Sequence, residues 1–169
     1  MIVLGIDPGT AVTGYGVVRR DGATQPFLIE CGVIRTHARA PLAKRLREIH
    51  DGIVELISRH KPDLLAVEDV FYAKNVRTTV VLGHARGVIL LAGEQAGVQI
   101  EEIPPASIKK AVVGSGNATK EQVQFMLTRL LRLKSAPEPA DAADGVAAAL
   151  ACLMGARVSS IATSHSIAS

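Results

Sequence analysis

The sequence predicts a single α/β domain built on a five-stranded mixed sheet with helices on its faces. The chain has 169 residues, enough for one domain with a buried core. Three short apolar segments rich in β-branched residues open the chain, separated by turn signals, as in an antiparallel meander. Later apolar segments alternate with long helical patterns, as parallel strands do. We expect residues 1–157 to form this domain and residues 158–169 to form a flexible polar tail.

The first half of the chain predicts three strands and a helix. Strands are expected over residues 2–7, 14–18 and 27–34, and the first should stop at the turn signal D-P-G-T. Apolar residues at helical spacing predict an amphipathic helix over residues 41–60, stopped by Lys61-Pro62. The sequence therefore opens as a meander followed by a helix.

The second half predicts strands alternating with helices. An unbroken apolar run at residues 64–68 is typical of a strand covered on both faces. Thr119 and Gln122 form a potential capping box at the start of a helix. The remaining expected elements are a helix over residues 76–97, a strand over 98–103, a short helix after Pro104-Pro105, a helix from 119 to 133, and a last helix from 140 to about 157.

Composition excludes several classes of protein. Hydrophobic residues make up 48% of the chain and charged residues 21%, which excludes global disorder and a collagen-like fibre. The apolar runs are far shorter than the ~20 residues that a membrane span needs. Cys31 and Cys152 have no C-x-x-C spacing, and the N-terminus shows no secretory signal, so a reduced cytoplasmic setting is expected.

Four carboxylates stand out as candidate catalytic and metal-ligating residues. Asp7 and Glu68 each end an apolar strand, and Asp141 and Asp144 lie three residues apart on one face of the last helix. If the helix packs across the strand ends, the four acids converge, and the alanines around them would allow a close approach. Converging carboxylates repel one another, and an all-oxygen ligand set suits a hard cation such as Mg²⁺ or Mn²⁺.

Each acid also has a purely structural explanation. An Asp before Pro-Gly is a common turn residue, and acids in the first turn of a helix interact well with its dipole. Strand alternation should turn Asp69 away from the side that Glu68 faces, so we assign Asp69 a supporting role. Periodicity alone does not show that the four acids meet.

Several motifs, taken in series, resemble the RuvC Holliday-junction resolvases of bacteria. The resemblance covers residue 2 to about residue 155. It rests on G-I-D-P-G-T at 5–10, T-G-Y-G-V at 13–17, V-E-D-V-F-Y-A-K-N at 67–75, L-G-H-A-R-G at 82–87, V-V-G at 112–114, K-E-Q-V-Q at 120–124 and A-D-A-A-D at 140–144.

The resemblance implies an RNase H-like fold and a homodimer that nicks four-way DNA junctions by two symmetric cuts. It implies that Asp7, Glu68, Asp141 and Asp144 hold two Mg²⁺ ions, with Mn²⁺ able to substitute. Paired ions stabilise both the attacking and the leaving oxygen of a phosphodiester. We expect Asp7 to bridge the two ions. The implied products carry a 5′-phosphate and a 3′-hydroxyl, and the implied partners are the RuvA and RuvB branch-migration proteins.

Basic and aromatic residues complete the expected site. By resemblance, Lys120 lies near the junction phosphates and serves catalysis, and an aromatic after the Glu68 strand stacks on an unpaired base at the crossover. The full set of expected DNA contacts is Phe71, Tyr72, Lys74, Arg77, Arg86, Lys109, Lys110 and Lys120.

This chain departs from the family pattern at two positions, and other functions stay open. Asp69 stands where relatives carry an amide, and His84 where a Gln is familiar. The D-P-G-T motif is also similar to the phosphate loop of actin-like ATPases, although a second phosphate loop is not recognisable. A junction-binding dimer without activity and a related nuclease acting on RNA are further alternatives.

Overall fold

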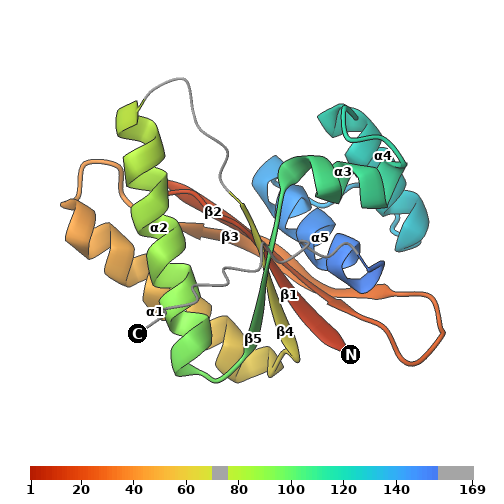
Figure 1. Ribbon diagram of the computed structural model, residues 1–169, viewed down its shortest axis with the longest axis horizontal. Helices are drawn as coiled ribbons and strands as arrows, with labels where there is room; N and C mark the ends of the chain where they lie inside the picture. Colours follow the sequence, from red (N-terminus) through yellow and green to blue (C-terminus); the bar gives the residue numbers. More distant parts are fainter. Residues whose placement is uncertain (70–75, 156–169) are drawn as a thin grey trace, which may run out of the picture.

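Five strands form one mixed sheet in the order β3-β2-β1-β4-β5 (Figure 1). The structure is a computed structural model that describes residues 1–69 and 76–155. The first three strands pair antiparallel, whereas β4 and β5 continue the sheet parallel to β1. The predicted fold class is therefore confirmed. The strands are β1 (Ile2–Asp7), β2 (Val12–Arg19), β3 (Phe27–Arg35), β4 (Leu64–Glu68) and β5 (Gln99–Ile103).

Helices cover both faces of this sheet (Figure 1). One face carries the two long helices α1 (Leu42–His60) and α2 (Val76–Gln95). The other face carries α5 (Ala140–Leu153), with α3 (Pro105–Val113) and α4 (Lys120–Leu130) packed outside it. Two hydrophobic cores result, one on each side of the sheet, as expected for strands that are apolar on both faces.

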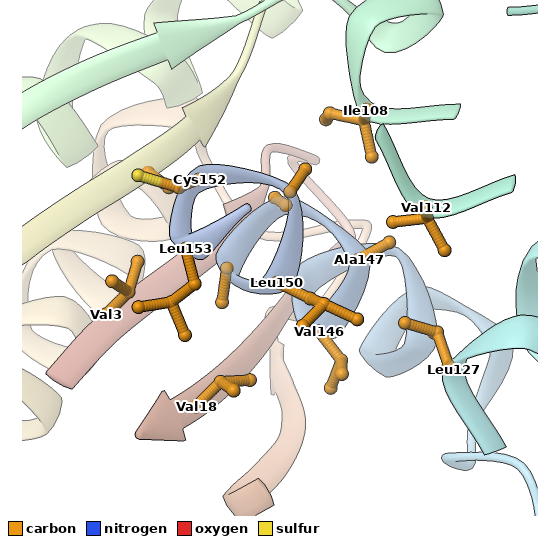
Figure 2. Close-up of a cluster of buried hydrophobic side chains, with 14 of the residues drawn as sticks. Val3, Val18, Ile108, Val112, Leu127, Val146, Ala147, Leu150, Cys152 and Leu153 are labelled. Atoms are coloured by element: carbon orange, nitrogen blue, oxygen red, sulfur yellow. The ribbon is translucent and has the colours of Figure 1, made fainter. Parts of the chain in front are cut away.

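Helix α5 lies at the centre of the second core. Figure 2 shows its side chains between the sheet residues Val3 and Val18 and the residues Ile108, Val112 and Leu127 of α3 and α4. All residues of α5 from 145 to 153 are buried, which explains why this helix is apolar all round beyond its first turn. The fold thus holds the helix that carries Asp141 and Asp144 directly against β1 and β2.

Glycines in the strands allow this close contact. A Cβ atom at Gly14 would overlap the backbone carbonyl of Asp141, and one at Gly5 would overlap that of Gly145. A Cβ at Gly16 would lie 2.5 Å from the Cα of Val146. The backbones of sheet and helix therefore touch, and the small residues of both elements set the depth at which α5 sits.

Most predicted boundaries match within a few residues. The predicted capping box is present, because Gln122 N donates to Thr119 Oγ1 and Thr119 N donates to Gln122 Oε1. The predicted extension of that helix to residue 133 is wrong: α4 ends at Leu130, and Arg132 takes a left-handed backbone conformation with φ of 51°. Within residues 1–69 and 76–155, every helix is too short or too polar to span a lipid bilayer.

Candidate active site

Strand alternation places Asp7 and Glu68 on the face of the sheet that α5 covers. β1 and β4 run parallel and in register, and the last pair before the two acids joins Ile6 to Val67. Ile6 and Val67 belong to the core under α1 and α2, so the next residue of each strand points to the opposite face. Two carboxylates therefore emerge side by side at the ends of neighbouring strands.

These acids line one pocket of about 250 Å³ together with a third acid from α5. Asp7, Glu68 and Asp144 form its acidic side, and Lys109 and Lys120 bring two cations to it. The rest of the wall is apolar and consists of Pro105, Ile108, Val123 and Ala147. The pocket thus collects residues from β1, β4, α3, α4 and α5, which are far apart in the sequence.

Lys120 is bound directly to one of the acids. Its Nζ donates to Asp144 Oδ2 at 2.9 Å, and this contact raises the pKa of Lys120. Thr119 caps α4, so the capping box fixes the start of the helix from which Lys120 reaches across. Asp141 lies one turn before Asp144; it does not line the pocket, but its charge is close enough to act on Asp7.

The pocket disfavours the charged form of its own acids. Burial, then the charge of Asp144, raises the pKa of Asp7 to about 7. Burial, then the charges of Asp7 and Asp144, raises the pKa of Glu68 to about 8. Lys120 opposes both shifts without cancelling them. The protein's own cations therefore do not offset the cost of ionising these acids.

This chemistry fits a hard divalent cation. The donors are carboxylate oxygens, half-buried and mutually repelling, and neither His nor Cys lines the pocket. In the described part of the chain, no three acidic, histidine or cysteine side chains lie close enough to hold one metal ion between them. The acids share a pocket, and they must draw closer together to share an ion.

The predicted DNA contacts occupy different environments. Lys109 and Lys120 line the acidic pocket, and Lys110 is exposed near the end of α3. Arg77 lies in the first turn of α2 and lines a groove of about 280 Å³ with Thr10, which follows the β1 turn. The remaining candidates Phe71, Tyr72 and Lys74 lie outside the described residues.

Arg86 lies among acids. One of its guanidinium nitrogens is 3.1 Å from Asp69 Oδ1 and contacts Glu102 Oε2. Asp69 does not line the acidic pocket, as alternation predicted. Sequence reasoning missed Glu102, although its position on β5 opposite Val67 places it on the α2 face. It also missed the role of Gly5, Gly14 and Gly16. Gly14 and Gly16 carry a signal, since a spacing of two places both on one face of β2.

A mixed sheet in this order, with carboxylates at the ends of β1 and β4 and on an adjoining helix, is the arrangement of the RNase H-like nucleases. Comparison with known proteins agrees. The family described as "Crossover junction endodeoxyribonuclease RuvC" matches residues 3–152. A protein of that name from Desulforamulus reducens is 46% identical over 151 residues, which cover 89% of this chain and 91% of the relative. Another from Moorella thermoacetica is 48% identical and covers 89% of both chains.

Solved structures extend the match to three dimensions. The structure titled "T. thermophilus RuvC in complex with Holliday junction substrate" superposes with a TM-score of 0.87 at 37% identity, covering 93% of this chain and 95% of that one. A yeast mitochondrial Holliday junction resolvase, 13% identical with a TM-score of 0.63 and covering 90% of this chain and 78% of that one, shares the fold. The chain belongs to the RuvC family of crossover junction endodeoxyribonucleases.

Proposed function

We propose that this chain resolves Holliday junctions in DNA recombination and repair by two symmetric nicks that leave 5′-phosphate and 3′-hydroxyl ends. The observation that supports this most directly is the pocket in which Asp7, Glu68 and Asp144 meet Lys109 and Lys120 in a chain of the RuvC family. Carboxylates that gather divalent cations beside lysines suit a negatively charged phosphodiester. Ends of this kind can be resealed by a ligase.

Two divalent cations, Mg²⁺ with Mn²⁺ as a substitute, would be held by Asp7, Glu68, Asp141 and Asp144. The charges of Asp144 and Asp141 both raise the pKa of Asp7, and the charge of Asp7 in turn raises the pKa of Glu68. Asp7 would therefore be central to the set of residues that holds the ions. When bound, such ions supply a water that is nucleophilic near neutral pH and neutralise the charge of the attacking and leaving oxygens.

The chain's own cations complete the chemistry. Lys120 holds Asp144 through its 2.9 Å hydrogen bond, so it orients this acid and adds positive charge where the phosphate must lie. Lys109 acts on Glu68 from α3. Ile108 and Val123 form part of the apolar wall of the pocket. We assign Lys120 to catalysis and both lysines to phosphate contact.

A homodimer suits a substrate with two-fold symmetry. Two residues on the outer face of α2, Gly83 and Gly87, have no atom within 4 Å of the position of a Cβ. Beside them, Val80 and Leu91 are about half exposed and line a groove of about 470 Å³. We propose that this strip binds a second copy of the chain, so that each protomer presents one acidic pocket to one strand of the junction.

The remaining proposed contacts follow from the family. Arg77 and Lys110 would contact the phosphate backbone, which sets the salt dependence of binding but not sequence preference. Phe71, Tyr72 and Lys74 precede α2 and would reach the crossover, where an aromatic ring can stack on an unpaired base. We further propose action in the cytoplasm together with RuvA and RuvB branch-migration proteins.

The function is tested by cleavage of a synthetic four-way junction in Mg²⁺. We expect paired nicks near the crossover, resealing of the products by a DNA ligase without prior phosphorylation, and no cleavage in excess chelator. Asp7→Asn should abolish cutting and leave junction binding intact, whereas Asp51→Asn, a change at an exposed acid of α1, should cut normally. Cleavage that persists in chelator would contradict the proposal.

Parallel substrates separate the alternatives. Linear duplex DNA, an RNA–DNA hybrid and ATP are incubated under the same conditions. Preferential cutting of the hybrid would support a nuclease acting on RNA, and turnover of ATP without any nicking would support an ATPase. Tight junction binding without cleavage by the wild-type chain would identify an inactive junction-binding protein.

A further inference from the structure

We propose that Arg86 is a positioning residue that, with Asp69 and Glu102, fixes the end of β4 so that Glu68 enters the acidic pocket. This Asp69–Arg86–Glu102 cluster lies on the α2 face of the sheet, opposite the pocket. The inference deepens the proposed nuclease function and rests on it for its activity readout. It replaces the expectation that Arg86 contacts DNA.

The geometry of the two parallel strands connects the cluster to Glu68. Glu68 pairs with Ile103 and Val67 with Glu102, and Asp69 N donates to Ile103 O at 2.9 Å. Because neighbouring residues of a strand point to opposite faces, Glu68 and Asp69 leave β4 in opposite directions. The ion pair that Asp69 forms with Arg86 therefore restrains the backbone from which Glu68 projects.

One guanidinium group serves both acids. Arg86 comes from α2, Glu102 from β5 and Asp69 from the end of β4, so the cluster joins three elements at one point. Both carboxylates contact the same guanidinium nitrogen, and the guanidinium group carries its charge permanently. Loss of Arg86 would leave two acids close together without a partner, and the end of β4 would be free to shift.

The same cluster leaves Arg86 poorly suited to bind DNA. Two carboxylates already surround one positive charge, so a phosphate would be a third anion at the same place. Arg86 Nε and Glu102 Oε2 are both buried, and neither has a hydrogen-bond partner of good geometry within residues 1–69 and 76–155. The Arg86 side chain is only 26% exposed, so most of it is covered by the protein.

Asp69 is the distinctive member of the cluster. It follows Glu68, a proposed metal ligand, directly in the sequence. An unpaired acid there would add negative charge to the edge of the site. Its 3.1 Å contact with Arg86 compensates that charge, and a hydrogen bond between two ionised groups is stronger than one between neutral groups.

Salt-dependent junction binding distinguishes positioning from phosphate contact. Affinity for a four-way junction is measured in chelator over a range of salt concentrations for wild type, Arg86→Gln and Arg47→Gln, the last a matched change at an exposed arginine of α1. A lost phosphate contact lowers the slope of log affinity against log salt by about 0.9. We expect the slope and affinity of Arg86→Gln to equal those of wild type; a fall of that size would overturn the proposal.

Cleavage should respond differently from binding. Arg86→Gln and Glu102→Gln should each lower kcat in Mg²⁺ by about tenfold and leave KM unchanged, because Glu68 is misplaced while binding is intact. Arg86→Lys should recover only part of this loss. A phosphate contact predicts the reverse pattern: Arg86→Lys would be nearly normal, and Glu102→Gln would bind the junction more tightly because it frees Arg86.

Hydrogen exchange tests the cluster without DNA, metal or activity. The amide of Asp69 is the direct reporter, since it bonds to Ile103 O beside Glu68. We expect this amide to exchange about tenfold faster in Arg86→Gln and in Asp69→Ala than in wild type, with no change in Arg47→Gln. Unchanged exchange of the Asp69 amide in both variants would overturn the positioning role, even if the chain cuts junctions. Faster exchange would support that role, even if the chain does not cut junctions.

Discussion

At the scale of single residues, the acidic pocket disfavours the ionised form of the acids that line it. Asp7 and Glu68 have pKa values of about 7 and about 8, first because they are buried and second because other acids are near. Their ordinary values are 3.8 and 4.5. Such shifts collect at functional sites, where a ligand supplies the compensation that the protein lacks.

The raised pKa values predict how stability depends on pH in the absence of divalent cations. A carboxyl whose folded pKa exceeds its unfolded value stabilises the fold below the unfolded value and loses that contribution as pH rises through the folded value. The free energy of unfolding should therefore fall between about pH 4 and pH 8. Thermal unfolding in chelator at pH 5 and pH 8.5 measures it.

Asp7→Asn should remove part of this dependence. At pH 8.5 the neutral amide replaces a carboxylate that is forced to ionise, and screening by solvent leaves about 1 kcal/mol of the effect, so Tm should rise by about 2–4 °C. Asp51→Asn on α1 is the control and should leave the dependence as in wild type. A variant Tm below that of wild type at pH 8.5 would contradict the electrostatic account.

We predict that Lys120 influences the pH range of cleavage. Its positive charge lowers the pKa values of both Asp7 and Glu68. Lys120→Met should raise them further, so the rising limb of the pH–rate profile for junction cleavage should move to higher pH and the maximal rate should fall. Lys120→Arg keeps the charge and should keep the position of the limb. An unshifted limb in Lys120→Met would show that this lysine does not act on the acids.

At the scale of elements, the approach of α5 to the sheet decides whether the acids meet. Gly14 touches the helix backbone at Asp141, and Gly145 of α5 touches Tyr15 of β2, where a Cβ would lie 2.6 Å from the Tyr15 Cα. No side chain fills this contact, so the distance between α5 and β2 is the least that backbones allow. The position of α5 on the sheet therefore determines the geometry of the acidic pocket.

Gly14→Ala should therefore damage both stability and the site. The added methyl overlaps the carbonyl of Asp141, and overpacking of this kind costs about 1–3 kcal/mol. We expect a fall in Tm of several degrees and a loss of junction cleavage as α5 moves away from Asp7. Gly116→Ala is a milder comparison and should cost less, because its Cβ would lie 3.3 Å from the nearest atom and not in overlap with it. A Gly14→Ala protein as stable and active as wild type would refute the close contact.

Most elements could be predicted from the sequence because their signals are local. Helical spacing predicted α1, and Thr119 with Gln122 predicted the start of α4. The end of α4 could not be predicted, because the apolar pattern continues beyond Arg132, whose backbone takes a left-handed conformation. The meeting of Asp7 with Glu68 also needs the register of β1 with β4, which no local pattern contains.

Long-range partners were the least predictable part of the site. The Asp69–Arg86–Glu102 cluster joins residues from β4, α2 and β5, and alternation indicated only that Asp69 faces away from Glu68. On β3, Glu30 similarly accepts a hydrogen bond from Tyr15 and contacts His60 at the end of α1. Such contacts depend on how the helices sit on the sheet.

At the scale of the whole molecule, the sheet separates two functions. One face carries α5 and the acidic pocket, and the other carries α2, whose apolar strip of Val80, Gly83, Gly87 and Leu91 faces outward. A chain that cuts both strands of a symmetric junction needs two pockets in fixed relation. The strip on α2 is where we expect the second copy to bind.

Leu91→Glu should therefore separate the protomers. Leu91 is 49% exposed, so a charge there should not disturb the core but should be unfavourable within an interface. Light scattering after size-exclusion chromatography should give the mass of a dimer for wild type and of a monomer for the variant, with paired nicking lost. Val54→Glu, at an exposed apolar position on α1, is the control; a dimeric Leu91→Glu would place the interface elsewhere.

The central claim is that the fold gathers acids into a site for divalent cations. The most direct test is to measure how much Mn²⁺ the protein binds at pH 8, with electron paramagnetic resonance reporting the ion that remains free. Acids gathered by the fold into one pocket should take up Mn²⁺ saturably, and Asp7→Asn should abolish most of that uptake while Asp51→Asn should not. Equal uptake by wild type and Asp7→Asn would contradict the account, because the pocket would then not be a cation site.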